Sequence, residues 1–396
     1  MNTGHYKIIN GRVITPAGIV EGGCVLVRDG IITAAGPADA AAAGASIVDA
    51  GGMFVSPGFI DIHVHGGGGF DFMDGHEEAF LEIAATHARY GTTAMLPTTL
   101  TSSAEELQTT LEVYRAVLDK NTAGAQFLGL HLEGPYLSRK QCGAQDPAYI
   151  RDPNPAEYKK IIAGTSFIKR WSAAPELPGA LEFGRYLTAS GILAAMAHTD
   201  AVYEEALAGF ENGYTLATHF YSAMSGVTRR NAFRYAGVVE AGYLIDAMDV
   251  EIIADGIHLP APLLQLVYKI KGAARTALIT DAMRGAGMPE GESVLGSIRN
   301  GLKVIIEDGV AKLPDRSSFA GSVATADRLV RNMVKLGTVS MQEAVRMMTS
   351  TPARILKVDQ RMGSLEPGKQ ADIVIFDDAV SVQMTMVKGN IVFNKI

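Results

Sequence analysis

Eight short apolar runs recur through the middle of the chain, separated by stretches whose apolar residues follow the helical period. The runs occupy residues 58–65, 93–100, 127–134, 167–176, 192–200, 214–221, 250–258 and 276–283. Apolar runs that alternate with helical stretches are typical of βα units, in which helices cover a parallel sheet. Eight units close a TIM-like (β/α)8 barrel. The pattern therefore predicts an α/β fold of this kind over residues 56–355. An open doubly wound sheet is the alternative, but no GxGxxG motif follows the first run.

Both ends of the chain have a different pattern, with short strands separated by turn residues. Asn10-Gly11 and Asp29-Gly30 are typical of hairpin turns. The tail repeats this character in the segments "GSLEPGKQADIVIFDD" and "SVQMTMVKGNIVFNKI". We therefore expect residues 1–55 and 356–396 to form one small β-sandwich domain built from both termini. The alternative is that each end is only a hairpin attached to the barrel.

Residues that bind metals or transfer protons stand at the ends of the apolar runs. The first run closes on His63-Val64-His65. Alternation along a strand places these two histidines on one face, together with Asp61. In barrel enzymes the C-terminal ends of the strands meet at the face that carries the active site. Six residues from five runs are therefore expected to converge: His63, His65, Glu133, His198, His219 and Asp281.

This set of residues predicts a metal site. Imidazole and carboxylate ligands without thiolates suit Zn²⁺, Fe²⁺ or a similar divalent ion. Any one of the residues alone could instead be a buried polar group that is satisfied by its neighbours. The agreement across five runs favours a site for one or two ions.

Composition narrows the class of protein. The chain has 396 residues, a formal net charge of −7 and 47% hydrophobic residues, which is typical of a globular protein with a large core. The net charge argues against nucleic-acid or membrane partners. Two cysteines imply no disulfide framework. The N-terminus lacks the features of a secretory signal, and no run of 18 apolar residues occurs. We expect a cytoplasmic protein.

Several longer segments resemble a known family. They are "VSPGFIDIHVHGGGGFDFMD", "LHLEGPYLS", "MAHTDA", "ATHFYSAM", "IIADGIH", "TDAMRGAGMPEGE", "FAGSVAT" and "GSLEPGKQADIVIFD". In this order they are similar to the amidohydrolase superfamily and, within it, to the family of N-acetylglucosamine-6-phosphate deacetylases. The resemblance covers essentially the whole chain. It implies a metal-dependent hydrolase acting on a phosphorylated N-acetyl amino sugar.

The resemblance also implies roles for the six candidate residues. Glu133, His198 and His219 would hold the ion that family members share. His63 and His65 would hold a second ion, which some members lack. Asp281 would be both a metal ligand and the catalytic residue, acting as general base and then as general acid.

Substrate contacts follow from the same resemblance. Arg230 would reach the phosphate across a homodimer interface, and residues 319–321 would close over the sugar. Two positions depart from the family pattern: Gln145 replaces a histidine, and Ser222 replaces an asparagine. The full set of expected contacts is Ala144, Gln145, Ser222, Ala223, Arg230, Asp255, His258, Phe319, Ala320 and Gly321.

Two rival functions stay open at this point. A sister deacetylase could act on another sugar, such as N-acetylgalactosamine 6-phosphate, because both departures concern recognition and not the metal ligands. A scaffold without catalytic activity on the same fold is the other rival. Such proteins tend to lose metal ligands, and all six are present here.

Overall fold

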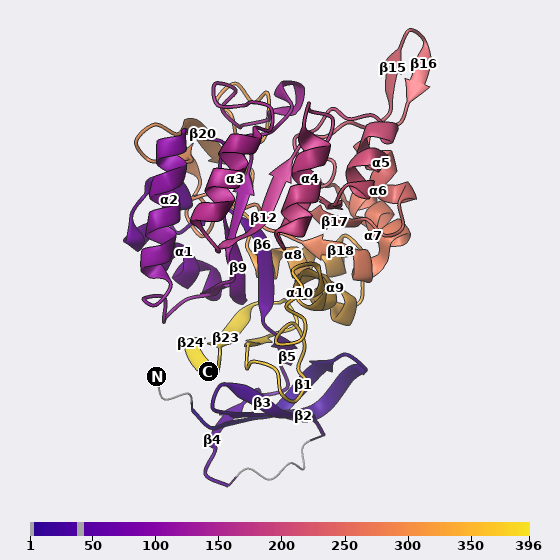
Figure 1. Ribbon diagram of the computed structural model, residues 1–396. Helices are drawn as coiled ribbons and strands as arrows, with labels where there is room; N and C mark the ends of the chain where they lie inside the picture. Colours follow the sequence, from indigo (N-terminus) through magenta and orange to yellow (C-terminus); the bar gives the residue numbers. More distant parts are fainter. Residues whose placement is uncertain (1–3, 38–42) are drawn as a thin grey trace.

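A parallel barrel forms the body of the protein (Figure 1). The structure is a computed structural model and describes residues 4–37 and 43–396. Within this range, eight strands follow one another around the barrel, and each overlaps one of the predicted runs. They are β6 (Phe59–Val64), β9 (Thr92–Thr99), β11 (Leu130–Glu133), β12 (Ile168–Ala173), β13 (Leu193–Met196), β14 (Tyr214–Ala217), β17 (Asp249–Ile252) and β18 (Thr276–Leu278). The predicted (β/α)8 barrel is confirmed.

Helices cover the outside of the barrel (Figure 1). They are α1 (Glu77–Ala88), α2 (Ala104–Val117), α3 (Pro155–Gly164), α4 (Ala180–Ala189), α5 (Tyr203–Glu211), α6 (Val238–Leu244), α7 (Ala261–Arg275), α8 (Ala326–Lys335), α9 (Met341–Met348) and α10 (Ser350–Ile355). Helix α2 begins with a capping box, in which Ser103 and Glu106 satisfy each other's backbone N–H groups. Outward-facing strand residues such as Trp171 are fully buried under these helices and form the main core.

Hydrogen bonds between β6 and the segment after β18 close the barrel. The N–H of Asp281 donates to the carbonyl of His63, and the N–H of His65 donates to the carbonyl of Ala282, both at 2.9 Å. The carboxylate of Asp61 accepts hydrogen bonds from both the N–H and the hydroxyl of Thr280. The last residues of the first and eighth strands are therefore held side by side.

The predicted alternation along β6, which placed Asp61 on one face with the two histidines, is wrong. The pairing of β6 with β9 shifts register between Asp61 and Val64. Ile60 and Ile62 pack in one apolar cluster, whereas Val64 packs in another. Irregularities of this kind re-aim side chains next to active sites. Here the shift turns His63 into the barrel while Asp61 bonds to Thr280 instead of joining the histidines.

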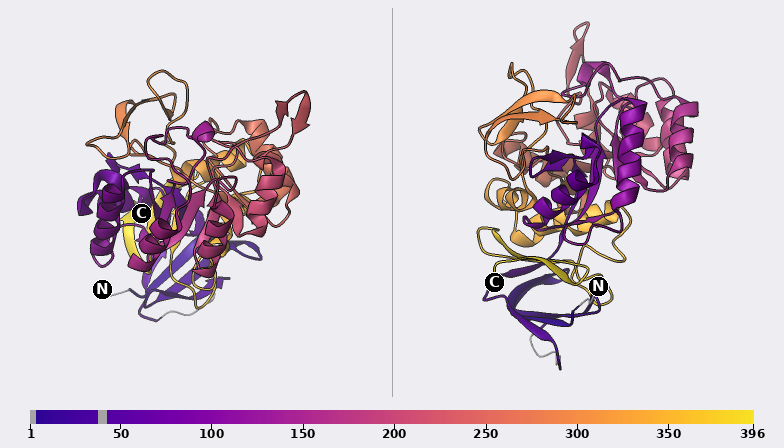
Figure 2. Two further views of the ribbon diagram at one scale, coloured as in Figure 1. Left: turned by 45° about the horizontal axis from the view of Figure 1, so that its top comes forward. Right: turned by 90° about the vertical axis from the view of Figure 1, so that its left-hand side faces the viewer.

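A second sheet, mostly antiparallel, lies at the opposite end from the active-site face described below (Figures 1 and 2). Its strands are β1 (Tyr6–Thr15), β2 (Gly18–Arg28), β3 (Ile31–Gly36), β4 (Ser46–Asp49), β5 (Phe54–Pro57), β22 (Ile373–Phe376), β23 (Val382–Val387) and β24 (Asn390–Asn394). Antiparallel pairing of β5 with β22 joins the two ends of the chain. Apolar residues of both parts share one core. The prediction of a small β domain from both termini is confirmed, and neither end is a separate hairpin.

Smaller elements surround the mouth of the barrel. A hairpin of β15 (Thr228–Arg230) and β16 (Phe233–Tyr235) projects from the body (Figure 1). A sheet of β19 (Gly291–Leu295), β20 (Leu302–Glu307) and β21 (Val310–Lys312) lies across the mouth from it (Figure 2). The short pieces are β7 (Gly66–Gly67), β8 (Phe70–Asp71), η1 (Phe72–Asp74), β10 (Gln126–Phe127) and η2 (Arg139–Gln141). Among the described residues, no helix has the length and apolar character needed to cross a bilayer.

Candidate active site

All six residues expected at the strand ends converge on one point. Glu133 lies at the centre: its Oε1 is 3.0 Å from Nε2 of His219, 3.3 Å from Nε2 of His198 and 3.6 Å from Nε2 of His63. Nε2 of His65 lies 3.4 Å from Oε2 of Glu133. Side chains separated by up to 218 positions along the chain thus meet, as the barrel topology predicts.

Asp281 completes the group on the side of the two N-terminal histidines. Its Oδ1 is 3.2 Å from Nε2 of His65 and 3.4 Å from Nε2 of His63. Nε2 of His63 and Nε2 of His65 are 3.1 Å apart. The His63-Val64-His65 motif therefore directs two imidazole nitrogens at the same point.

Three of the six residues have backbone angles that residues other than glycine rarely adopt. The φ angles of His198, His219 and Asp281 are +47°, +30° and +46°. Each residue follows a strand by two or three positions, so the chain turns sharply where it leaves the barrel. Residues with such angles cluster at functional sites, because the surrounding structure must hold them in place. The turns direct these side chains inward.

Hydrogen bonds to backbone carbonyls fix the rings of two histidines. Nδ1 of His198 donates to the carbonyl of Gln141 at 2.8 Å, and Nδ1 of His219 donates to the carbonyl of Ser222 at 3.1 Å. A carbonyl only accepts, so the proton is on Nδ1 and the lone pair of Nε2 is free to bind an ion. Among the described residues, Nδ1 of His63 and of His65 has no hydrogen-bond partner.

Opposing charges control the protonation of the carboxylates. Burial alone would raise the pKa of Asp281, but the neighbouring His63 and His65 lower that pKa to about 2. Burial would likewise raise the pKa of Glu133, and the surrounding histidines hold it well below its usual range. Both carboxylates are therefore ionised near neutral pH. They favour positive charge between them.

The donor atoms fit a metal ion in two overlapping sets. His63, His65 and Glu133 form one set, and Glu133, His198 and His219 form the other. In each set the three ligand atoms lie within 4.8 Å of one another, and all three residues are buried. Imidazole nitrogens and carboxylate oxygens of this kind suit divalent transition metals. Glu133 belongs to both sets, so two ions would share it.

A buried ion pair beneath the site was not expected from the sequence. Arg170 on β12 and Glu251 on β17 are fully buried, and the two terminal guanidinium nitrogens of Arg170, Nη1 and Nη2, bond to the carboxylate of Glu251. Oε2 of Glu251 is 3.9 Å from Nδ1 of His63. The only sequence signal is a charged residue within each of two predicted strands, and nothing in the sequence says that the two charges meet.

A hydroxyl network continues from this pair. Nε2 of His131 is 2.7 Å from the hydroxyl of Ser172, and Nδ1 of His131 is 3.2 Å from the hydroxyl of Thr98. Thr218 links Ser172 to Arg170. The ring of His131 packs edge-on against His63 with 4.6 Å between centroids. This layer supports the metal-binding side chains from below.

A cavity of about 290 Å³ is lined by five of the six residues: His65, Glu133, His198, His219 and Asp281. His63 lies buried behind them. Of the ten expected substrate contacts, seven line it: Ala144, Gln145, Ser222, Ala223, His258, Phe319 and Gly321. Ala320 is instead buried in a neighbouring apolar cluster. Arg230 lies on the projecting hairpin, and its side chain is outside the part of the chain that the structure describes.

Asp255 orients one residue of the cavity wall. Its Oδ2 accepts a hydrogen bond from Nδ1 of His258 at 2.7 Å, while Oδ1 accepts the N–H groups of Ile257 and His258. The ring of Phe319 lies against the His258 ring, with 4.7 Å between centroids. Asp255 thus fixes the tautomer of His258 and leaves its Nε2 free to face a ligand.

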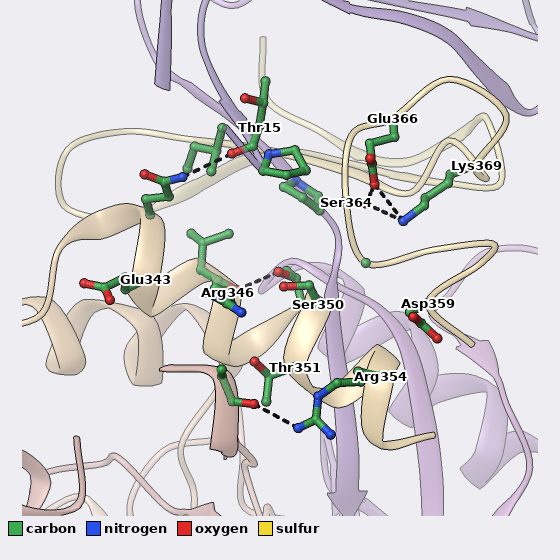
Figure 3. A pocket seen from close by; sticks show the side chains of 18 of the residues that line it. Thr15, Glu343, Arg346, Ser350, Thr351, Arg354, Asp359, Ser364, Glu366 and Lys369 are labelled. Carbon is green, nitrogen blue, oxygen red and sulfur yellow. Dashed lines mark hydrogen bonds and ion pairs between the residues drawn. The ribbon is translucent and has the colours of Figure 1, made fainter. Parts of the chain in front are cut away.

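A larger cavity of about 680 Å³ lies between the barrel and the small sheet, at the other end of the molecule (Figure 3). Its cationic side chains are largely paired: Lys369 lies 2.8 Å from Glu366, and Arg354 lies 2.6 Å from Asp249. None of the six candidate residues lines it. The chemistry is therefore assigned to the smaller cavity.

Comparisons with known proteins show the family to which the chain is similar. The family model described as "Amidohydrolase family" matches residues 54–392. An N-acetylgalactosamine-6-phosphate deacetylase of Escherichia coli O157:H7 is 34% identical over 381 residues, covering 96% of this chain and 97% of that protein. An N-acetylglucosamine-6-phosphate deacetylase of Lysinibacillus sphaericus is 34% identical and covers 88% of each chain.

Solved structures show the same similarity. An N-acetylglucosamine-6-phosphate deacetylase from Pasteurella multocida superposes with a TM-score of 0.91 at 29% identity, covering 98% of this chain and 99% of that one. A mutant N-acetyl-D-glucosamine-6-phosphate deacetylase from Mycobacterium smegmatis, in complex with N-acetyl-D-glucosamine-6-phosphate, gives 0.90 at 31% identity over 99% of this chain and 100% of that one. The chain belongs to the amidohydrolase family.

Proposed function

We propose that this chain hydrolyses the acetamide of N-acetylglucosamine 6-phosphate to acetate and glucosamine 6-phosphate. The observation that carries the proposal is the convergence of both donor sets and Asp281 at one cavity, in a chain whose relatives are named deacetylases of such sugars. We expect the reaction to take place in the cytoplasm, as part of amino-sugar breakdown.

The metal centre is part of the proposal. Glu133, His198 and His219 would hold one divalent ion, and His63 and His65 would hold a second ion that shares Glu133, with zinc or iron as the candidates. When bound, such an ion polarises the substrate carbonyl and lowers the pKa of a water molecule.

Asp281 would transfer the proton that the reaction requires. Because its pKa is lowered to about 2, its carboxylate is ionised near neutral pH and is able to accept a proton. It takes a proton from the attacking water as the oxygen forms a bond to the acetyl carbon. It then donates that proton to the nitrogen as the carbon–nitrogen bond breaks, so acetic acid and the free amine leave. The acid then ionises to acetate and its proton passes to the amine.

The cavity wall would select the sugar phosphate. His258, held by Asp255, offers the lone pair of Nε2 to a hydroxyl of the sugar, and Phe319 offers an apolar face to the ring. For the phosphate we propose Arg230, supplied by the partner of a homodimer. The projecting hairpin supports this assignment, because Phe233 and Val227 on it are 72% and 61% exposed and would pack against a second copy.

A second candidate substrate is N-acetylgalactosamine 6-phosphate. It is favoured by the relative from Escherichia coli O157:H7, which is named a deacetylase of that sugar and matches nearly the whole chain. The two sugars differ only at one hydroxyl, so the metal site serves either.

Steady-state assays separate the two candidates. The panel is the two 6-phosphates and unphosphorylated N-acetylglucosamine, each with the metal-loaded enzyme. We expect the highest kcat/KM for N-acetylglucosamine 6-phosphate and a loss of at least about tenfold without the phosphate, because one charged hydrogen bond contributes about 1.5–3 kcal/mol. No release of acetate from any of the three would refute the proposed function.

A further inference from the structure

Gln145 has a protein partner at each end of its side-chain amide, although the family resemblance assigns it to the substrate. Its Oε1 accepts the backbone N–H of Thr101 at 2.8 Å, and its Nε2 donates to Oε2 of Glu133 at 2.7 Å. The residue is 6% exposed at the edge of the cavity. Both ends of the amide therefore have protein partners.

The partners also fix which way the amide points. A backbone N–H only donates, so the atom facing Thr101 must be the oxygen of Gln145. The nitrogen then faces Glu133, where it only donates. A tight turn holds the backbone in place, because the N–H of Gln145 donates to the carbonyl of Cys142 at 2.9 Å. Gln145 is thus a permanent, uncharged hydrogen-bond donor to Glu133.

This donor acts on the one residue that both metal sets share. Oε1 of Glu133 lies nearest His219 and His198, at 3.0 and 3.3 Å, with His63 farther away at 3.6 Å. Oε2 faces Gln145 and His65. Because Gln145 holds Oε2, the plane of the Glu133 carboxylate is set and Oε1 is directed at His198 and His219. Since the bond to Gln145 occupies one lone pair of Oε2, this oxygen is a weaker ligand for an ion held by His65.

We infer that Gln145 is a positioning residue of the metal centre and not a substrate contact. It orients Glu133 for the ion held with His198 and His219. The inference rests on the proposed metal site, so its test measures metal affinity as well as activity. Partners that orient a ligand typically contribute 10- to 100-fold to metal affinity.

The test replaces Gln145 by methionine, which has a similar shape but no donor. Metal-free protein is titrated with Zn²⁺ against a chromophoric chelator, and kcat and KM are measured for N-acetylglucosamine 6-phosphate. We expect Gln145→Met to weaken Zn²⁺ binding at the site of Glu133, His198 and His219 about 10- to 100-fold and to lower kcat at saturating substrate, with KM within about threefold. Gln145→Ala, which introduces no bulk, should give the same loss of affinity.

The matched control is Gln126→Met. Gln126 is also buried and donates through Nε2 to a carboxylate, that of Asp372 at 3.1 Å, but it lies outside the site. It reports what the loss of such a bond does to the fold alone, and Zn²⁺ affinity should not change. Unchanged Zn²⁺ affinity in both Gln145 variants, with a KM raised tenfold or more, would overturn the inference in favour of a substrate contact. Failure of the wild-type chain to bind either Zn²⁺ or Fe²⁺ would overturn the proposed metal site, and the inference with it.

Discussion

The two pairs of histidines that form the halves of the candidate metal site are held differently by the protein. His198 and His219 each anchor Nδ1 on a backbone carbonyl, which fixes the orientation of the ring. His63 and His65 have no such anchor among the described residues, although the HxH motif is the most conspicuous feature of the sequence. Ease of recognition in a sequence therefore does not measure how well a ligand is held.

The difference assigns an order of binding to the two ions. An imidazole whose Nδ1 is hydrogen-bonded already has the tautomer that leaves Nε2 free for an ion, whereas a ring without that bond must first adopt it. The ion held by Glu133, His198 and His219 should therefore bind first and more tightly. The ion at His63 and His65 should be the one that is lost first.

Asp281 adjoins the weaker half, yet its chemistry should be indispensable. We expect Asp281→Asn to lower kcat by about 10²- to 10⁴-fold, the range of a general acid–base residue, because asparagine neither accepts nor returns the proton. Metal content, measured on the purified variant, should keep the tightly held ion. Activity within tenfold of the wild type would rule out the assigned role.

Removing one ligand from each half tests the comparison itself. His219→Ala should reduce kcat/KM by at least about 100-fold, because a direct ligand matters at least as much as the partners that orient it. His65→Ala should reduce it about tenfold or less, since Asp281 and the first ion are retained. Assays are made at one fixed Zn²⁺ concentration. A larger loss in His65→Ala than in His219→Ala would reverse the proposed order.

The ion pair of Arg170 and Glu251 below His63 should contribute to the stability of the fold and not to the binding of the first ion. Arg170→Met would leave the buried carboxylate of Glu251 without its partner, which typically costs about 3–5 kcal/mol. Urea denaturation of the metal-free protein measures the loss. The double variant Arg170→Met with Glu251→Met should recover much of it, because no unpaired charge remains. No recovery would show that packing, and not charge, is what the pair provides.

Asp372 is a buried carboxylate without histidines around it, and so a contrast to Asp281. Here burial prevails and raises the pKa to about 6, against an ordinary value of 3.8. Between pH 4 and 6 the unfolded chain therefore binds fewer protons than the folded one at this position, so its contribution to stability is lost as pH rises through this window. Above pH 6 the contribution of Asp372 to stability no longer changes with pH.

Asp372→Asn should remove this pH dependence. Relative to the wild type, the variant should gain on the order of 3 kcal/mol in free energy of unfolding between pH 4 and pH 7, about two pKa units. The amide keeps an acceptor for the N–H of Lys388, which now bonds to Oδ1 at 2.9 Å. Chemical denaturation across this pH range is the measurement, and a difference that does not vary with pH would contradict it.

Much of the fold was predictable because it depends on local patterns. Eight apolar runs gave the eight strands, and their polar ends gave the six converging residues. The register shift in β6 was not predictable, because it depends on pairing with β9. The bond between Gln145 and Glu133 was also missed, since the two residues lie twelve positions apart and the segment between them has no regular structure beyond the short η2. Backbone anchors such as the carbonyl of Gln141 leave no trace in side-chain identity.

Stepwise Zn²⁺ titration of the metal-free chain tests the unequal halves most directly. We predict two binding steps for the wild type, with the tighter step retained and the weaker step lost in His65→Ala. In His219→Ala the tighter step should disappear. A single class of equal sites in the wild type, or loss of the tighter step in His65→Ala, would contradict the assignment of the anchored histidines to the first ion.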